Sequence, residues 1–202
     1  MQVAQESAGQ SERISTLRAE QKSLRHEATT DRLTGLANRA SFDDAIARVV
    51  DDRLLGRTRS GPSPLAMIDI DRFKVVNDVH GHICGDHVLA AVGRRLAETT
   101  RADEIIARYG GEEFVLIAPI VPDMQHLESL AERFRKGIAE LRIEFQGAAL
   151  VVTVSVGALA VVHLDPTDPV TTLVEGADEL LYAAKAAGRN TSRTRFSATV
   201  EQ

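Results

Sequence analysis

The sequence predicts an α/β fold in which helices flank a sheet of mixed strand directions. The apolar run 64–70 is short and continuous, as is typical of a buried strand. Two further strand-like runs, 104–109 and 112–118, are joined by Gly110-Gly111, which favours a tight antiparallel hairpin. Stretches with helical periodicity separate the run 64–70 from this hairpin, and because the hairpin is antiparallel an all-parallel sheet is not expected.

Residues 1–28 are expected to form a polar N-terminal helix. Its heptad-like positions hold Ile14, Leu17, Gln21, Leu24 and Ala28. Two interpretations stay open, because so few heptads do not establish a coiled coil: a dimerising stalk at the end of a longer relay helix, or a solvated single helix. We therefore divide the chain into a helix over 1–28, a globular domain over 29–198 and a tail over 199–202.

The globular part is expected to alternate helices and strands. Ser41 is a suitable N-cap for its first helix, and glycine, serine and proline residues mark the loop that follows. In chain order we expect a turn over 31–39, a helix from Ser41 to about Leu55, a loop over 56–64, the strand 64–70, a helix over 72–79, a loop over 80–85, a helix over 86–99, the hairpin, a helix over 124–142, a strand over 148–158, a helix over 171–187 and a strand over 191–196.

Composition narrows the class of function. The 202 residues carry a net charge of −5 with a pI of about 5.7, which argues against a general DNA or RNA binder because phosphate contacts need a basic surface. A single cysteine, Cys84, excludes a disulfide within the chain and a cysteine-based zinc site, and fits a reducing compartment. We expect a cytoplasmic chain without signal peptide or membrane segment, although its parent protein could be membrane-anchored.

Two acidic residues stand at the end of the strand 64–70. Asp69 and Asp71 are two positions apart and should point to one face, where their oxygens could hold a hard cation. We expect Asp71 instead to cap the helix that starts at Arg72. Asp69 remains the candidate ligand, because an unpaired carboxylate in an apolar strand would be costly.

Glu112 and Glu113 follow Gly110-Gly111 directly. The glycine pair leaves room for a ligand to approach the backbone closely, so the two carboxylates could belong to a binding site. They could equally be surface glutamates after a hairpin turn. The hairpin alone does not decide between the two.

Six blocks of sequence together resemble the GGDEF domain family. They are Asp31–Arg39, Asp69–Lys74 with Asn77-Asp78, Gly81–Asp86, Gly110–Phe114, Thr153–Gly157, and a C-terminal signature of Ala177-Asp178, Tyr182, Ala184-Lys185 and Gly188–Asn190. No single block would suffice, but six in the family's order make a chance match improbable.

The resemblance implies a palm-like sheet, related to that of nucleotidyl cyclases, and a diguanylate cyclase activity that condenses two GTP into cyclic di-GMP. It implies two Mg²⁺ or Mn²⁺ ions in each active site. Their implied ligands are Asp69, the main-chain carbonyl of Ile70 and Glu112, with Glu113 for the second ion. Glu112 is also the implied base, unless a metal-bound alkoxide makes a separate base unnecessary.

The matching positions imply a substrate site as well. Phosphate contacts fall to Lys74, Arg108, Lys185 and Arg189, with Phe73, Gly110 and Gly111 beside the nucleotide and Asn77, His82 and Asp86 around the guanine. A carboxylate can accept the two adjacent donors of guanine, whereas it would face the N1 lone pair of adenine. Lys185 and Arg189 could also complement a helix dipole, and His82 could simply bind backbone in a loop.

One block departs from the family pattern. Many members carry Arg-x-x-Asp shortly before the signature, as a site for inhibition by the product. Here the residues are Arg101 and Glu104, and the longer glutamate must fold back to place its oxygens. We expect product inhibition to be weakened, with Arg101 retaining weak binding.

The resemblance further implies catalysis by a homodimer and an upstream sensor domain or protein. Two alternatives are weighed against it. A silent GTP- or cyclic di-GMP-binding module would be free to lose Asp69, Lys74, Asn77, Asp86 and Glu112, all of which are present. An enzyme making cyclic GMP-AMP would need a relaxed base pocket, against which Asp86 argues.

Overall fold

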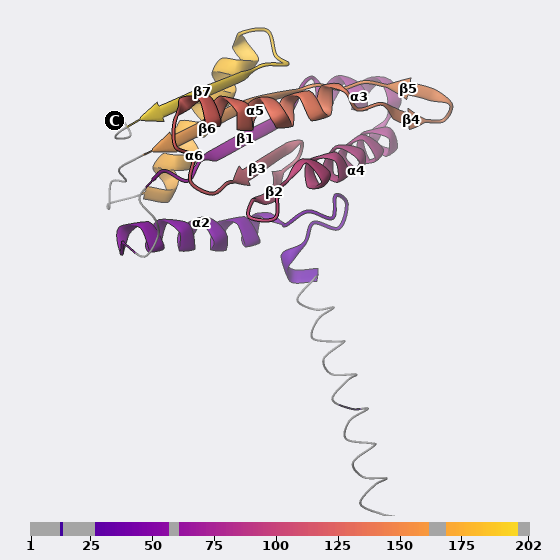
Figure 1. Ribbon diagram of the computed structural model, residues 1–202. Coiled ribbons are helices and arrows are strands. Elements are labelled where there is room, and N and C mark those ends of the chain that lie inside the picture. Colours follow the sequence, from indigo (N-terminus) through magenta and orange to yellow (C-terminus); the bar gives the residue numbers. More distant parts are fainter. Residues whose placement is uncertain (1–12, 14–26, 57–60, 162–168, 198–202) are drawn as a thin grey trace, which may run out of the picture.

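The protein is built as three layers, with a sheet between two layers of helices, as the computed structural model in Figure 1 shows. The structure describes residues 13, 27–56, 61–161 and 169–197. The predicted N-terminal helix therefore lies almost wholly outside the described residues, and so does the predicted tail. Within the described ranges no helix has the length and apolar character needed to span a membrane.

Helices and strands alternate along the chain, which confirms the predicted mixed α/β class. The helices are α2 (Arg39–Leu54), α3 (Phe73–His80), α4 (His82–Thr99), α5 (Met124–Ala139) and α6 (Pro169–Ala186). The strands are β1 (Leu65–Ile70), β2 (Ile105–Gly110), β3 (Glu113–Ile117), β4 (Ile143–Phe145), β5 (Ala148–Leu150), β6 (Val154–Val161) and β7 (Ser192–Ser197).

Five strands form the main sheet in the order β2-β3-β1-β6-β7. β1 is antiparallel to both of its neighbours and β2 is antiparallel to β3, whereas β6 and β7 are parallel. β4 and β5 form a separate two-stranded hairpin. The strand directions are therefore mixed, as predicted.

β1 lies at the centre of the sheet, and all six of its residues are buried. Leu65 and Met67 pack with side chains of α2 and α6, whereas Ala66, Ile68 and Ile70 pack with those of α3, α4 and α5. Because both faces of this strand are covered, its sequence is a continuous apolar run instead of an alternating one.

α6 lies directly against β6 at Gly157. A Cβ atom added there would stand 2.1 Å from the main-chain nitrogen of Leu181 and 2.4 Å from the carbonyl oxygen of Ala177. Since these are backbone atoms, no side-chain rotation could relieve the clash. This close approach holds the C-terminal part of α6 beside the end of the sheet.

Two helix starts differ from the prediction. Asn38, not Ser41, caps α2, because the Asn38 side chain accepts a hydrogen bond from the Ser41 nitrogen at 3.0 Å. The predicted loop over 80–85 is wrong: α4 begins at His82, directly after α3. Gly81 makes the whole connection with a φ of 81°, a conformation that glycine adopts without strain.

The predicted strand 148–158 is also wrong, because the structure divides it into β5 and β6. β5 pairs with β4, which starts just after the predicted helix over 124–142 and had not been predicted; that helix ends earlier, at Ala139. Gln146 and Gly147 connect β4 and β5 with φ values of 49° and 82°. Two consecutive positive φ angles are typical of a primed hairpin turn, which such short strands did not reveal.

We expect Gly157→Ala to lower the free energy of unfolding by about 3 kcal/mol, because its methyl group would press on the backbone of α6. Urea denaturation measures the change. Gly137→Ala is the control: its Cβ would meet the side chain of Thr99, with the hydroxyl at 3.2 Å and the methyl at 3.9 Å, and alanine favours the helix. Equal stability of Gly157→Ala and wild type would contradict the close packing of α6 on β6.

Candidate functional site

The end of β1 and the β2–β3 hairpin bring three acidic residues together. Asp69 is paired across the sheet with Glu113 on one side and with Ser155 on the other, so these three side chains share the face covered by α6. The main-chain nitrogen of Ile70 donates to the carbonyl oxygen of Glu112 at 3.3 Å. The hairpin turn is thereby fixed against the end of β1.

The turn itself lies one residue later than predicted. Gly110 is paired with Glu113, so Gly111 and Glu112 are its two central residues. Only Gly111 has a positive φ, of 51°, and the strand register shifts between Arg108 and Gly110. This irregularity places Glu112 at the tip of the turn, half-buried beside β1.

Lys185 of α6 pairs with Asp69, with 2.9 Å between Nζ and Oδ2. Burial raises the pKa of Asp69 to about 6, an effect that the Lys185 ammonium opposes and the charges of Glu112 and Glu113 reinforce. The three carboxylates are therefore close enough to repel one another. A positive charge bound between them would stabilise their ionised forms.

The donor set at this end of β1 suits a divalent cation. Mg²⁺ and Mn²⁺ prefer oxygen ligands, and the carboxylates of Glu112 and Glu113 lie close enough to Asp69 to affect its pKa. In the described part of the chain, no three acidic, histidine or cysteine side chains already converge as a formed metal centre. Lys185 contacts Oδ2 of Asp69, so a bound ion would share this carboxylate with the lysine or replace it.

Arg108 braces the hairpin. Its Nε and Nη2 donate to the carbonyl oxygen of Gly111 at 3.0 and 2.8 Å, and its Nη1 donates to the carboxylate of Asp31 at 3.1 and 3.3 Å. The guanidinium, predicted from the family pattern to act on phosphate, thus lies between the turn and the segment that precedes α2.

Asp31 had no predicted role. Burial raises its pKa, but hydrogen bonds from Thr34 and the charge of Arg108 outweigh that effect, and its pKa lies below the usual value. The Thr34 nitrogen and hydroxyl donate to it at 2.9 and 2.7 Å. The Asp-x-x-Thr spacing is a local signal for such a turn, but nothing in the spacing identifies the distant partner Arg108.

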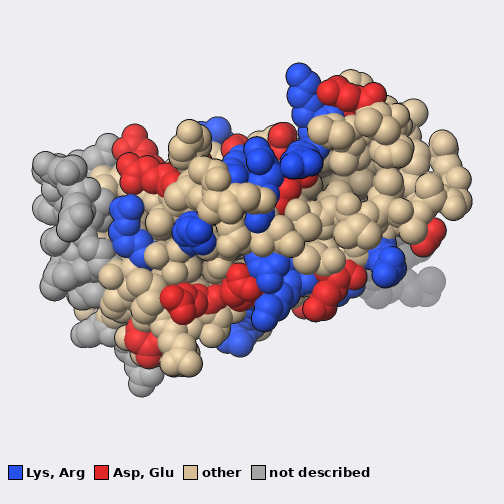
Figure 2. All heavy atoms as spheres, turned by 90° about the horizontal axis from the view of Figure 1, so that it is seen from above, with Lys and Arg blue, Asp and Glu red and all other residues tan. Residues whose placement is uncertain are grey.

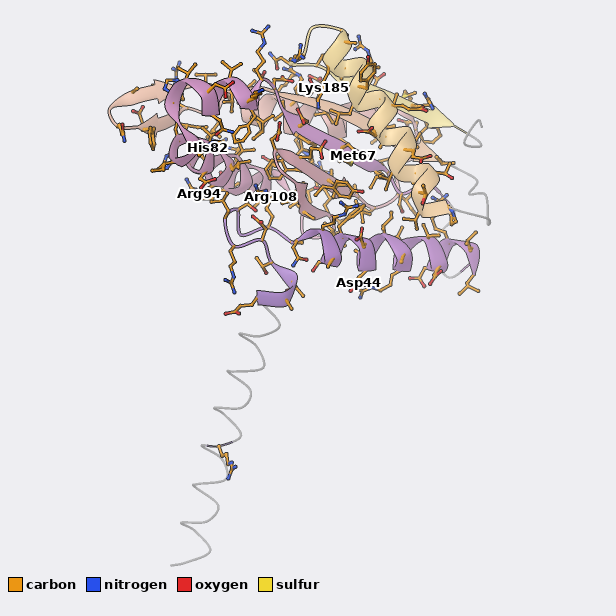
Figure 3. The ribbon with its side chains drawn as sticks, turned by 180° about the vertical axis from the view of Figure 1, so that it is seen from behind. Asp44, Met67, His82, Arg94, Arg108 and Lys185 are labelled. Carbon is orange, nitrogen blue, oxygen red and sulfur yellow. The ribbon has the colours of Figure 1, made fainter. Side chains whose placement is uncertain are left out.

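The predicted guanine-binding residues lie on two consecutive helices, Asn77 on α3 and His82 and Asp86 on α4. A Cβ atom at Gly85 would stand 1.9 Å from Oδ1 of Asn77, so only glycine leaves space for the amide there. His82 and Asp86 lie exposed on the first turns of α4, and Lys74 is exposed near the start of α3. Figure 3 labels His82, Arg108 and Lys185, which come from three different elements.

Phe73 is only 7% exposed and packs in the core. Its side chain therefore supports α3, and any contact with a nucleotide would come from its main chain.

The prediction that Asp71 caps α3 is wrong. The N-cap residue is Arg72, with a φ of 56° and no capping hydrogen bond from a side chain. The buried Asp71 carboxylate accepts hydrogen bonds from Thr153, Ser155 and the main chain of Asn190. Arg189 follows α6 and lines, with Arg72 and Asp71, a cavity of about 360 Å³.

Glu104, of the predicted product site, is buried. Its carboxylate accepts the main-chain nitrogen of Arg101 at 2.8 Å and pairs with Arg133 of α5. Arg133 was not predicted. With the exposed Arg101, Glu104 and Arg133 line a cavity of about 180 Å³.

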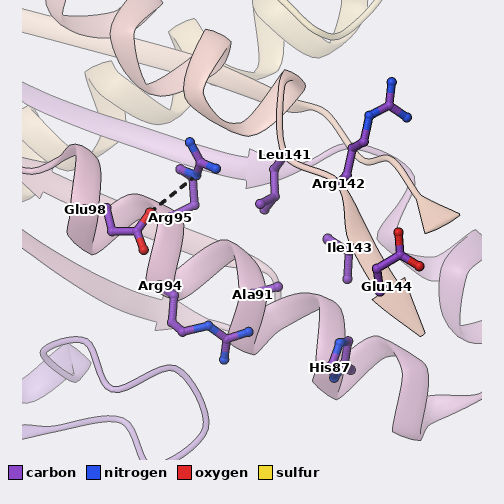
Figure 4. A pocket seen from close by; sticks show the side chains of 9 residues that line it. All are labelled: His87, Ala91, Arg94, Arg95, Glu98, Leu141, Arg142, Ile143 and Glu144. Carbon is purple, nitrogen blue, oxygen red and sulfur yellow. Dashed lines mark ion pairs between the residues drawn. The ribbon is translucent and has the colours of Figure 1, made fainter. Parts of the chain in front are cut away.

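A further cavity of about 350 Å³ lies between α4 and β4 (Figure 4). It is lined by His87, Ala91, Arg94, Arg95, Glu98, Leu141, Arg142, Ile143 and Glu144, none of which is a predicted site residue. Acidic and basic side chains are likewise interspersed over the face that Figure 2 shows. Neither this cavity nor the face in Figure 2 carries a broad patch of one sign of charge.

Comparison with known proteins identifies the family of this site. The sequence model described as "Diguanylate cyclase, GGDEF domain" matches residues 28–191. Diguanylate cyclase DgcP of Pseudomonas aeruginosa is 39% identical over 166 residues, which are 82% of this chain and 24% of that protein. Cyclic di-GMP phosphodiesterase NbdA of the same species is 34% identical over 175 residues, which are 85% of this chain and 21% of that protein.

A solved structure gives the same fold. The coiled coil and GGDEF domain of DgcB from Caulobacter crescentus, in complex with c-di-GMP, superimposes with a TM-score of 0.82 at 30% identity, covering 96% of this chain and 100% of that one. This chain spans a quarter or less of the length of the two curated relatives.

We expect Asp69→Asn to change how stability depends on pH. Because the pKa of Asp69 is raised to about 6, the folded chain keeps a proton that the unfolded chain releases near the ordinary aspartate pKa of 3.8. The contribution of this retained proton to the free energy of unfolding is complete at low pH and is lost as pH rises through about 6. Wild type should therefore lose about 2 kcal/mol relative to Asp69→Asn between pH 4 and pH 7.

Urea denaturation in EDTA at each pH measures this difference, because the other carboxylates titrate in both proteins. Mg²⁺ added at pH 7 should raise the melting temperature of wild type more than that of Asp69→Asn. A stability difference that does not change with pH would contradict the burial and charge crowding of Asp69.

Proposed function

The chain belongs to the GGDEF family of diguanylate cyclase domains, and on that premise we propose that it condenses two GTP into cyclic di-GMP with release of two pyrophosphates. The observation that carries the proposal is the position of Asp69. The β1 register sets it opposite Glu113 and beside the turn that presents Glu112, where Lys185 neutralises it from α6.

The reaction is a phosphoryl transfer repeated in two directions. The 3′-oxygen of each GTP forms a bond to the α-phosphorus of the other, the bond from that phosphorus to the bridging oxygen breaks, and pyrophosphate leaves. A bound pair of divalent ions, Mg²⁺ or Mn²⁺, would offset the phosphate charge and lower the pKa of the attacking hydroxyl. Asp69, the Ile70 carbonyl, Glu112 and Glu113 would hold these ions.

Glu112 has a second role in the proposal. It lies at the tip of a turn that Arg108 and Ile70 fix from two sides, so its carboxylate is held at the end of β1. From there it could accept the 3′-hydroxyl proton as that oxygen attacks. Arg108 would assist by keeping the turn in place.

The triphosphate would be bound by cations at two ends of the site. Lys74 and the main-chain nitrogens at the start of α3, including that of Phe73, lie on one side. Lys185 and Arg189 lie on the other, at the end of α6 and just after it. Lys185 pairs with Asp69 in the structure, and with that carboxylate serving as a metal ligand its ammonium would be available to phosphate.

Guanine would be read between α3 and α4. The Asn77 amide lies against Gly85, and Asp86 follows Gly85 on α4. Asp86 would accept the N1–H and 2-amino donors of guanine while Asn77 binds an acceptor on the other edge. The backbone of Gly110 and Gly111 is open at the hairpin, where no neighbouring atom would crowd an added Cβ.

Two copies of the domain would meet face to face, because neither site alone can close the cyclic product. We propose that residues 1–28 act as the stalk of this homodimer and pass on the state of an upstream sensor to the catalytic domain 29–198. The support lies at residues 28–41: Asn38 and Ser41 bond to the carbonyls of Ala28 and Thr29, and Asp31 pairs with Arg108 of the hairpin.

A second candidate function is a silent module that binds GTP or cyclic di-GMP without turnover. It is favoured by one observation, the match to a segment of a cyclic di-GMP phosphodiesterase. Identification of the products formed from GTP distinguishes the cyclase from the silent module, since a silent module would bind GTP and leave it unchanged.

Product inhibition is proposed to be weak. Arg101 is exposed and could contact a phosphate of cyclic di-GMP, but the carboxylate of Glu104 is already occupied by Arg133 and by the Arg101 main chain. Binding the product through Glu104 would therefore require these bonds to be exchanged.

Incubation with GTP and Mg²⁺, followed by chromatographic identification of the products, tests the activity. We expect cyclic di-GMP and pyrophosphate from wild type. Glu112→Gln should lower turnover at least about thousandfold, because it removes a metal-binding charge at constant shape. Glu179→Gln, which changes an exposed glutamate of α6, is the control and should keep full activity.

Activity of Glu112→Gln within about tenfold of wild type would contradict the site. The same assay, run over a roughly hundredfold range of protein concentration, also addresses the dimer by mass action. Specific activity that stays constant across the range would contradict catalysis by a dissociating homodimer.

We expect Asp86→Ser to relax the choice of base. Without the carboxylate, guanine loses its two paired acceptors and adenine no longer meets lone-pair repulsion. From an equal mixture of GTP and ATP, the adenine-containing share of product should rise at least about tenfold. His87→Ser, one residue further along α4, is the control. An unchanged share in Asp86→Ser would show that Asp86 does not read the base.

A further inference from the structure

Asp71 is a buried acidic residue that the proposed chemistry does not use. It is 8% exposed, and its carboxylate accepts three hydrogen bonds. Oδ2 accepts the Thr153 hydroxyl at 2.6 Å and the Asn190 nitrogen at 2.9 Å, and Oδ1 accepts the Ser155 hydroxyl at 2.6 Å. All three donors are neutral groups, two hydroxyls and one main-chain N–H, and between them they occupy both carboxylate oxygens.

These partners come from distant parts of the sequence. Thr153 and Ser155 lie before and within β6, and Asn190 follows α6. The main chain adds one more bond, from the Asp71 nitrogen to the Thr153 carbonyl at 2.9 Å. Asp71 thus joins the end of β1 to the turn that follows α6.

That turn has an unusual backbone. Gly188, Arg189 and Asn190 have φ values of 112°, 67° and 44°, three consecutive residues with positive φ. Only the first is a glycine, and side-chain-bearing residues adopt this conformation when surrounding bonds hold them there. A turn of this kind would relax to other conformations if its anchoring bonds were lost.

Two anchors hold the turn at Asn190. The Asp71 carboxylate accepts its main-chain nitrogen, and Nη1 of Arg135 donates to its side-chain oxygen at 2.7 Å. Arg135 is itself fixed by Glu132, whose oxygens accept its Nε and Nη2 at 2.9 to 3.0 Å. The residue immediately before this anchored position is Arg189.

We propose that Asp71 is a positioning residue: it holds the 188–190 turn so that Arg189 presents its guanidinium to the terminal phosphates of the nucleotide. Asp71 itself touches no substrate. The inference rests on the proposed function, since it takes phosphate as the ligand of Arg189. It explains why a carboxylate at the end of β1 faces two hydroxyls and a main-chain nitrogen instead of a metal or a lysine.

Asparagine and alanine at position 71 should behave differently. In Asp71→Asn, the amide oxygen can accept from Thr153 and Asn190 while the amide nitrogen donates to the Ser155 hydroxyl, so the turn should keep its conformation. In Asp71→Ala all three bonds are lost. Rescue by asparagine would show that the hydrogen bonds, and not the charge, position the turn.

The test compares two ligands of different length. Wild type, Asp71→Asn, Asp71→Ala, Arg189→Ala and the double variant Asp71→Ala/Arg189→Ala are titrated with a non-hydrolysable GTP analogue and with GMP. Asp71→Ala should weaken binding of the GTP analogue about tenfold and leave GMP within about twofold, because only the longer ligand reaches Arg189. Asp71→Asn should bind both ligands like wild type.

The double variant supplies a test of coupling. If Asp71 acts through Arg189, the double variant should bind the GTP analogue no more weakly than Arg189→Ala alone. Additive losses, or equal losses for the GTP analogue and GMP, would overturn the inference, because a general loss of folded protein affects both ligands alike. Glu179→Ala on α6 is the matched control and should change neither affinity.

Amide hydrogen exchange gives a readout without nucleotide. The Asn190 amide should exchange faster in Asp71→Ala than in wild type or Asp71→Asn, and unchanged exchange would overturn the inference. If Asp71→Ala does not fold, Thr153→Val removes one of the three bonds and should shift exchange and GTP-analogue affinity in the same direction by smaller amounts.

A failure of the proposed function is recognised separately. If Arg189→Ala binds the GTP analogue as tightly as wild type, Arg189 does not contact phosphate. The proposed phosphate site is then wrong at Arg189, and the inference about Asp71, which depends on it, is wrong as well. If Arg189→Ala weakens binding but Asp71→Ala does not, the proposed phosphate contact stands and the positioning role of Asp71 is wrong.

Discussion

The register of β1 between β3 and β6 is the constraint on which the rest of the site depends. Six buried residues and two antiparallel neighbours fix that register, and a slip by one residue would move Leu65 and Met67 from one hydrophobic layer to the other. The same register sets Asp69 opposite Glu113 and brings Asp71, just past the strand end, to Ser155. Core packing thereby positions two buried carboxylates in different surroundings: Asp69 pairs with the Lys185 ammonium, and Asp71 accepts hydrogen bonds from neutral donors.

The second requirement is that the hairpin stays folded over the end of β1. Arg108 bonds the carbonyl of Gly111 and the carboxylate of Asp31, so the turn that carries Glu112 is tied to the segment preceding α2. The ring of Tyr109, beside Arg108, is covered by Arg39 at 4.4 Å, which adds a second link between α2 and β2. A displacement of residues 28–39 would therefore reach Glu112 through few bonds, which gives the proposed stalk a physical route to the active site.

The fold class and the buried strand could be predicted because both depend on local apolar patterns. The cap of α2, the start of α4 and the β4–β5 hairpin could not, since Asn38 and Ser41 are both good capping residues, one glycine made a whole connection, and three-residue strands have little periodicity. The family resemblance predicted Asp69, Glu112 and Glu113 as site residues, but the contacts among these carboxylates depend on tertiary structure. The Asp31–Arg108 pair and the partners of Asp71 span up to 119 positions, and no spacing rule identifies such pairs.

Divalent ion binding at the end of β1 is the central claim, and electron paramagnetic resonance of Mn²⁺ tests it most directly. Wild type, Asp69→Asn and the control Glu179→Gln are titrated with Mn²⁺ in the presence of a non-hydrolysable GTP analogue, and free Mn²⁺ is measured from its signal. We predict saturable binding in wild type and the control, and at least about tenfold weaker binding in Asp69→Asn, although all three proteins remain folded. Equal Mn²⁺ binding by wild type and Asp69→Asn would contradict a metal site built on Asp69.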